Sequence, residues 1–268
     1  FGKSISLNSN GSRLAVGVPE GSAYSGYVRV YEFNGTDWVQ MGANIPSVTS
    51  GDKRGTSVAL NDVGSKIVIG ARYGSSSLRG TTQVLSWNGS AWQSEYSIDG
   101  SAANDESGCS VAMNALGDYV AIGARYYDLP GGNAGQVRVF TYINNNVVQV
   151  GGDILGVAAN DLSGGSISIN AAGDMIVIGS ELADASGKTN CGHARVFKFT
   201  PGTAVDLQTR LQTGTWSQVG TAQSGLAADD AFFSVAINSA GNRIIVGGKF
   251  NDTNAANAGV ARIFQLTE

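Results

Sequence analysis

The chain has 268 residues, 38 glycines and four prolines, and only 14 % of its residues are charged. A formal net charge of −4 argues against a nucleic-acid partner, which would require a basic surface. No apolar run is long enough to cross a bilayer, so we expect no membrane insertion. The length suits one domain over residues 1–268, and the composition suits short strands joined by turns.

Five similar segments follow one another along the chain. Each has an apolar strand that begins at a serine, a turn at an asparagine, and a second apolar run that ends in a glycine. The glycine recurs every 53 to 68 residues, a period typical of radial or stacked repeats. The approximate repeats are 1–53, 54–106, 107–162, 163–230 and 231–268.

Each repeat predicts a meander of four antiparallel strands. In the second repeat, residues 56–60 and 66–69 form the first two strands, joined by a glycine-containing hairpin. In the first repeat, residues 27–31 and 38–40 form the third and fourth strands, joined through Asn34-Gly35. Neighbouring repeats must cover the faces of such a sheet. The predicted fold is therefore an all-β propeller with five four-stranded blades, with part of a seven-bladed ring as the alternative.

The fifth repeat stops after its third predicted strand. Three explanations remain open: a three-stranded blade, a chain that belongs to a longer array or complex, or a missing adjoining piece. The sequence has no initiating methionine and no signal peptide, so we expect a mature or excised piece of a protein.

Several motifs of the chain resemble the FG-GAP repeats of integrin alpha subunits and their extracellular relatives. The resemblance lies in Phe1-Gly2 before a serine-apolar strand, in Ile69-Gly70-Ala71 and Ile122-Gly123-Ala124, and in the run 135–140. It covers the whole chain and implies a propeller with an adhesive or binding role. The chain departs from the family where the proline of GAP is replaced, at Arg72, Arg125, Glu181 and Lys249.

Many integrin repeats hold calcium in the hairpin between the first two strands. Calcium takes six to eight oxygen ligands, and turns such as 61–65 and 114–118 do not supply them. The resemblance therefore does not carry its calcium sites into these hairpins, and we predict no metal site there. Calcium remains possible on the loop face described next.

Aspartates recur before the first strand and in the loop between the second and third strands. Both kinds of loop should emerge on one side of the meanders, giving an acidic loop face for a cation or a polyhydroxyl ligand. Alternatively, these side chains cap their own turns. The tentative ligand-binding residues are Asp52, Asp105, Asp128, Asp161, Asp184, Asp229 (or its neighbour Asp230) and Asp252.

A recurring arginine stands between apolar residues of the third strand. We expect it to fill the space between blades and to pair with an aspartate or a loop carbonyl, with an anion-binding ring as the alternative. The residues concerned are Arg29, Arg138, Arg195 and Arg262.

No residue set predicts catalysis, and we expect no catalytic residues. The single histidine, His193, occupies a replaceable repeat position and is expected at the surface. Cys109 and Cys191 are either a possible disulfide or two free thiols. Repeat four has an insertion at 200–214 with apolar residues Val205, Leu207 and Leu211, either a docking element or decoration.

These observations predict a non-catalytic binding or adhesion propeller, extracellular or at the cell surface, that engages a protein or a glycan through its loop faces. The alternatives are a structural or assembly subunit of a larger surface complex and, with less support, a polysaccharide-acting enzyme.

Overall fold

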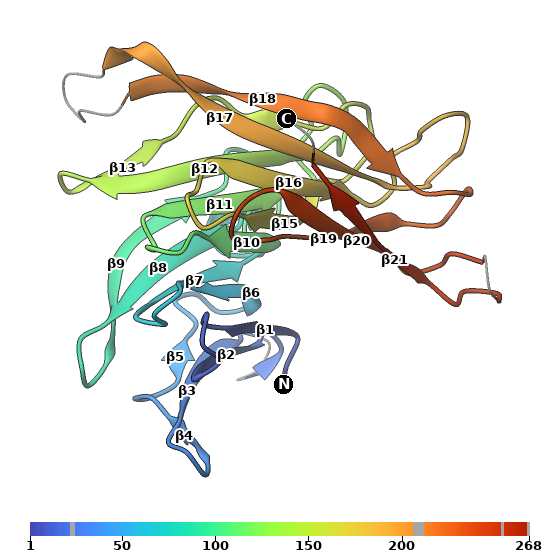
Figure 1. Cartoon of the computed structure of the whole chain (residues 1–268). Helices are drawn as coiled ribbons and strands as arrows, with labels where there is room; N and C mark the ends of the chain where they lie inside the picture. Colours follow the sequence, from blue (N-terminus) through green and yellow to red (C-terminus); the bar gives the residue numbers. More distant parts are fainter. Residues whose placement is uncertain (22–24, 206–211, 253–254, 267–268) are drawn as a thin grey trace. The chain divides into compact units, whose positions relative to one another are not determined.

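The computed structural model describes residues 1–21, 25–205, 212–252 and 255–266. Strands make up nearly all of the regular secondary structure within these residues, and a short 3-10 helix, η1, lies at Ser76–Leu78. The strands form five antiparallel sheets, the blades of a β-propeller (Figure 1). The predicted all-β fold with five blades is confirmed.

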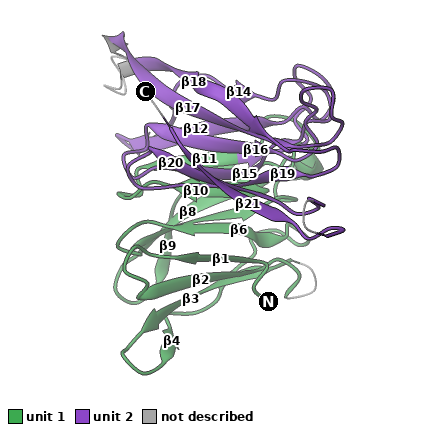
Figure 2. Ribbon diagram, turned by 45° about the vertical axis from the view of Figure 1, so that its right-hand side comes forward, with its two compact units in different colours: residues 1–122 green, residues 123–268 purple. Residues whose placement is uncertain are grey.

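The chain divides into two compact units, Phe1–Ile122 and Gly123–Glu268 (Figure 2). The first unit contains two complete sheets, each ordered along the chain. The strands of the first sheet are β1 (Ser4–Leu7), β2 (Arg13–Val18), β3 (Tyr27–Phe33), β4 (Trp38–Gln40) and β5 (Ile45–Pro46). Those of the second are β6 (Arg54–Leu60), β7 (Lys66–Ala71), β8 (Thr81–Trp87) and β9 (Trp92–Asp99).

The boundary between the units falls within the third sheet, in β11. The strands of this sheet are β10 (Ser110–Met113), β11 (Tyr119–Ala124), β12 (Gln136–Ile143), β13 (Asn146–Gln149) and β14 (Ile154–Leu155). The fourth sheet has β15 (Ser163–Ile169), β16 (Met175–Ser180), β17 (His193–Val205) and β18 (Gln212–Ser224). The fifth has three strands among the described residues: β19 (Phe232–Ile237), β20 (Arg243–Gly248) and β21 (Val260–Gln265).

The fourth strand of a blade takes two forms. In the first and third sheets it is interrupted, so that both β4 and β5 pair with β3, and both β13 and β14 pair with β12. In the second and fourth sheets the fourth strand is continuous. There the pairing of the third and fourth strands contains register shifts, which accommodate residues that have no partner opposite them. The sequence predicted the segment 38–40 but not the short strand after it.

The second strand of each blade is its most buried element. In β7, Ile67, Val68 and Ile69 are at most 1 % exposed. Side chains of successive strand residues point to opposite faces, so a continuous apolar run requires cover on both. The neighbouring blades provide that cover.

The repeated serine and glycine form the contact between neighbouring blades. Ser4 Oγ donates to the carbonyl of Gly55 at 2.9 Å, and Ser57 Oγ donates to that of Gly108 at 2.8 Å. A Cβ atom on Gly70 would lie 2.1 Å from Gly108 O, so this position admits no side chain. The motif that defines the repeat therefore sets how closely adjacent blades approach.

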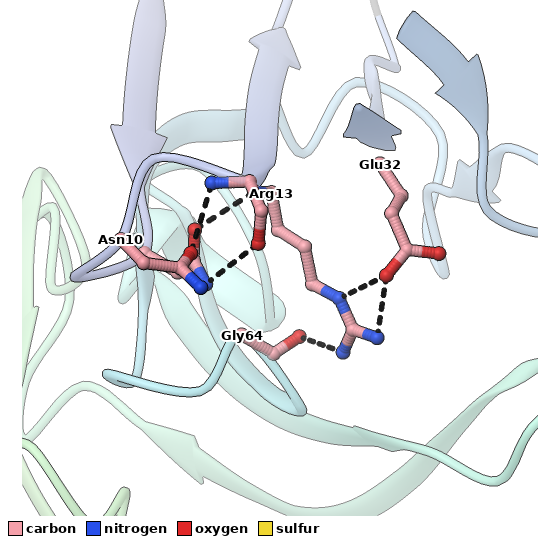
Figure 3. A network of polar contacts seen from close by, with 6 residues as sticks. Asn10, Arg13, Glu32 and Gly64 are labelled. Carbon is pink, nitrogen blue, oxygen red and sulfur yellow. Dashed lines mark hydrogen bonds and ion pairs between the residues drawn. The ribbon is translucent and has the colours of Figure 1, made fainter. Parts of the chain in front are cut away.

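The hairpins between first and second strands also link neighbouring blades. Ser9 N donates to Asp62 O and Asp62 N donates to Ala115 O, both at 3.1 Å. Arg13 adds a second link, because its guanidinium bonds Glu32 of its own blade and Gly64 O of the next, at 2.8 and 3.1 Å (Figure 3). These hairpins thus serve blade association.

Candidate functional site at the loop ends of the blades

The aspartates that precede the first strands are buried in their own loops. Asp52 is 3 % exposed and accepts the backbone N–H groups of Thr49 and Arg54, at 3.3 and 3.0 Å. The other blades repeat this arrangement at 2.6–3.1 Å, with Asp105 accepting from Ala102, Asp161 from Val157 and Ala158, and Asp230 from Leu226 and Ala227. These four carboxylates shape the loops by capping them.

The structure assigns the repeated position in the fifth blade to Asp230 rather than Asp229. Asp230 is 2 % exposed, and it also accepts from Asn251 Nδ2 at 3.0 Å. Asp229 is exposed and accepts from Asn190 Nδ2 at 3.1 Å. The two adjacent acids cannot be distinguished by sequence spacing alone, because either fits the period.

The aspartates between the second and third strands are exposed. One carboxylate oxygen of each accepts a backbone N–H from further along its loop: Asp128 from Asn133, Asp184 from Asn190 and Asp252 from Asn257, at 3.0, 2.8 and 2.6 Å. No group of three or more His, Cys, Asp or Glu residues that could hold a metal ion occurs in the described part of the chain. Calcium at the loop face stays an alternative that the sequence leaves open.

A hollow of about 250 Å³ lies in the first unit at the same loop ends. Three parts of the chain that are distant in sequence form it. They are the residues before β1, the loop after β2, and the start of β6 together with the residue after β7. We call it the basic hollow, and its lining residues are Phe1, Lys3, Pro19, Glu20, Lys53, Thr56 and Arg72.

Positive charge dominates the basic hollow, since its lining holds three cations and one carboxylate. Lys53 Nζ lies 3.7 Å from Glu20 Oε1, and Arg72 Nη1 lies 3.8 Å from Glu106 Oε2. Lys3 is exposed, and its ammonium group has no hydrogen bond or ion pair with any described residue. An uncompensated cation therefore faces this hollow in a chain whose net charge is −4.

Aromatic rings accompany these cations. Phe1, which lines the basic hollow, is 76 % exposed. The Arg72 guanidinium stacks on the Tyr73 ring at 4.7 Å, which fixes the direction of its donors. Arg72 stands where the FG-GAP motif that the chain resembles has a proline, and this departure is the sequence signal for Arg72. The departure alone does not predict a site.

The recurring arginines differ in environment. Arg195 is 7 % exposed, and its Nη2 donates to the main-chain carbonyl of Leu155 at 2.7 Å and to Ser163 Oγ at 3.2 Å. The predicted pairing with a carbonyl between blades is confirmed for this residue, although Leu155 belongs to β14 and not to a loop. Arg29 is less buried, stacking on Tyr27 at 5.2 Å and donating through Nε to Asn44 Oδ1 at 3.0 Å.

His193 is 5 % exposed, so its predicted surface position is wrong. It is the first residue of β17. Its pKa is lowered to about 4, chiefly by burial and then by the positive charge of Arg195, while the charge of Asp161 opposes the shift. A histidine that stays neutral inside a blade fits a packing role.

Neither Cys109 nor Cys191 forms a disulfide. Cys109 is partly exposed, whereas Cys191 is buried with its Sγ 3.6 Å from the carbonyl oxygen of Ala183. Burial raises the pKa of the Cys191 thiol, which disfavours its reactive thiolate form. The sequence left open a disulfide between these residues or two separate thiols, and the structure contains the two separate thiols.

The insertion of repeat four extends the hairpin formed by β17 and β18. Leu207 and Leu211 lie outside the described residues, as does the side chain of Val205. Docking through this segment stays a prediction.

No protein-family model and no curated protein sequence matches the chain. Among solved structures, hydrazine synthase of Kuenenia stuttgartiensis is similar, with a TM-score of 0.56 and 12 % sequence identity. The match covers 92 % of this chain and 61 % of that chain, so this chain spans about three-fifths of its length. At this identity the likeness concerns the fold alone. No helix in the described residues is long and apolar enough to cross a membrane.

Proposed function

We propose that the chain is a non-catalytic, extracellular or cell-surface binding propeller that engages an acidic glycan through the basic hollow. The observation that carries the proposal is the convergence of Lys3, Lys53 and Arg72 on one hollow with an exposed aromatic ring. The resemblance to FG-GAP repeats supports a binding role of this kind.

The lining chemistry suits a sugar that carries a carboxylate or a sulfate group. A guanidinium offers paired donors to such an anion, and the stacking on Tyr73 holds the Arg72 fork in place. The ammonium of Lys3 supplies a second charge without first giving up a partner. The ring of Phe1 offers an apolar face for the C–H side of a sugar. A hollow of about 250 Å³ suits one sugar unit or the end of a chain rather than a long segment.

Two features support a non-catalytic role. The one histidine of the chain is buried in a blade. The four buried aspartates already accept backbone N–H groups, so their oxygens serve the loops rather than acid–base chemistry. Turnover of any member of a polysaccharide panel by the isolated chain would contradict this part of the proposal.

The test is a glycan array with uronate-bearing, sulfated and neutral oligosaccharides, followed by calorimetry on the best binder. We expect binding of acidic members, weakened at least tenfold by Arg72→Ala, because a hydrogen bond to a charged group contributes about 1.5–3 kcal/mol. Lys66→Ala is the matched control, since Lys66 belongs to the same unit but pairs with Glu95 at 3.1 Å away from the hollow. Affinity should also fall with salt.

The exposed carboxylates of Asp128, Asp184 and Asp252 support a second candidate, in which hydroxyl groups of a neutral glycan or a bridging cation bind the loops of the second unit. Array binding that is lost on replacing these three residues by alanine, and retained in Arg72→Ala, would favour it. A stable stoichiometric protein complex without any glycan binding would instead favour the assembly-subunit function.

A further inference from the structure

A second cavity, of about 300 Å³, lies between the first and second blades. The segment 43–48 of the first blade forms one wall, and residues of β6, β8 and β9 with the turn before β9 form the other. We call it the Arg54 cavity. Its lining from the second blade is Arg54, Gln83, Leu85, Ala91, Trp92 and Ser94, which shares no residue with the basic hollow.

Arg54 is a buried cation with few partners. It is 3 % exposed, and its guanidinium makes one hydrogen bond, from Nη2 to the side-chain oxygen of Gln83. Its Nε has no acceptor, and no carboxylate of the described residues is within ion-pair distance of it. Burial lowers the pKa of Arg54, and the negative charge of Asp52 opposes this shift. The Asp52 carboxylate, however, accepts backbone N–H groups and makes no hydrogen bond with the guanidinium. A buried charge without a counter-ion is costly unless something else compensates it.

The fourth blade shows how this guanidinium position is satisfied elsewhere. There the arginine is Arg195, the third residue of β17, and its partner Ser163 is the first residue of β15. In the second blade the two positions are exchanged, with Arg54 first in β6 and Gln83 third in β8. Nε lacks an acceptor in both cases, but Arg195 also reaches the main-chain carbonyl of Leu155. Arg54 has no such carbonyl, and it borders a cavity instead.

A second donor in the same lining also lacks an acceptor. Trp92 Nε1 and Arg54 Nε are both buried, and neither has a hydrogen-bond acceptor among the described residues. The remaining walls are largely apolar, with Ile45, Val48 and Leu85 among them. The cavity thus combines donors that need acceptors with a surface that suits an apolar body.

We propose that the Arg54 cavity binds a small organic carboxylate, with its anionic head against Arg54 and Trp92 and its apolar body between Ile45 and Leu85. Gln83 is the group that the head displaces from Nη2, and Ser94 Oγ, which already accepts from Gln83 Nε2 at 2.8 Å, holds the released amide. The carboxylate neutralises the guanidinium through paired hydrogen bonds. This site is independent of the glycan proposed for the basic hollow.

Calorimetric titration of the full chain with phenylacetate, phenylphosphonate and the neutral isostere phenylacetamide tests this inference. We expect phenylacetate to bind at least tenfold more tightly than phenylacetamide, because only the acid compensates the buried charge. Preference for phenylphosphonate would overturn the choice of a carboxylate. Equal affinity for the acid and the amide, or no binding of either at millimolar concentration, would overturn the site.

Variants locate the binding. Arg54→Gln should weaken phenylacetate binding about tenfold or more, whereas Arg243→Gln should not, since Arg243 is an exposed arginine paired with Gln265. Trp92→Phe keeps the ring, removes the donor, and should weaken binding several-fold. If Arg54→Gln does not fold, the Trp92→Phe variant and the acid–amide comparison on the unchanged protein decide the question. Unchanged phenylacetate affinity in folded Arg54→Gln would refute the proposal.

Discussion

The contact between the repeated serine and glycine makes a sharp prediction about stability. Gly70 has an ordinary strand conformation, so its backbone would accept alanine. The added Cβ, however, would lie 2.1 Å from Gly108 O and 2.3 Å from Ser57 Oγ. The serine can rotate, but the carbonyl belongs to the main chain of the next blade. Gly70→Ala must therefore push the second and third blades apart.

The size of the effect follows from two opposing terms. Overpacking of a closely fitted site costs about 1–3 kcal/mol, and this contact belongs at the upper end because one partner is backbone. Replacing glycine by alanine restricts the unfolded chain and returns about 0.4–1 kcal/mol. The expected net loss is about 2 kcal/mol, which corresponds to a fall in Tm of about 4–8 °C for a domain of this size.

Thermal and urea unfolding followed by circular dichroism measures this loss, with Gly152→Ala as the matched control. Gly152 is also free of left-handed strain, and nothing lies within 4 Å of its would-be Cβ, so that variant should be unchanged or slightly stabilised. Adding Ser57→Gly to Gly70→Ala should restore little of the stability, because the carbonyl remains. A Gly70→Ala variant as stable as Gly152→Ala, or full rescue by Ser57→Gly, would refute this explanation of the repeat.

Further predictions concern buried polar groups and the two proposed sites. The pKa of His193 is about 4 in the folded chain and 6.5 ordinarily, so the unfolded chain binds more protons between these values and stability falls as pH drops from 6.5 towards 4. Urea unfolding at several pH values should show that the free energy of unfolding falls by up to about 3 kcal/mol in the unchanged protein, and that this fall is absent from His193→Gln. Identical pH profiles of the two proteins would contradict the burial of a neutral histidine. Asp52→Ala should lower the free energy of unfolding by about 1–3 kcal/mol, because it leaves buried N–H groups without an acceptor. Asp128 is exposed, so Asp128→Ala should lower it by less than about 1 kcal/mol in the same measurement. Equal losses in the two variants would contradict the argument from burial. Arg72→Ala and Arg54→Gln should each abolish most of one ligand's binding and leave the other unchanged, and calorimetry with an acidic oligosaccharide and with phenylacetate separates the two.

Features that depend on neighbouring residues were accessible from the sequence. The glycine-containing hairpins and the first three strands of each blade follow from alternation and turn chemistry within a dozen residues. The capping by Asp52 was one of two stated alternatives, because the N–H groups that donate to its carboxylate lie in its own loop. The spacing also placed Arg195 between blades, where the structure has it.

Features that depend on the packing of separate blades were not accessible. The basic hollow needs Lys3, Lys53 and Arg72 together, and no local pattern connects three segments so far apart in the sequence. The burial of His193 could not be predicted from its own strand, because alternation along a strand does not tell which residues neighbouring elements cover. At the Arg54 cavity, the arginine and its partner stand on the opposite strands from those they occupy in the fourth blade. This exchange changes two positions of the repeat, and neither change alone predicts a cavity.

A crystal structure of the chain with the tightest-binding acidic oligosaccharide tests the proposed function most directly. The account predicts the anionic group of the sugar within hydrogen-bonding distance of the Arg72 guanidinium and the Lys3 ammonium, with a sugar face on Phe1. A sugar bound instead over Asp128, Asp184 and Asp252, with the basic hollow free of ligand, would contradict it.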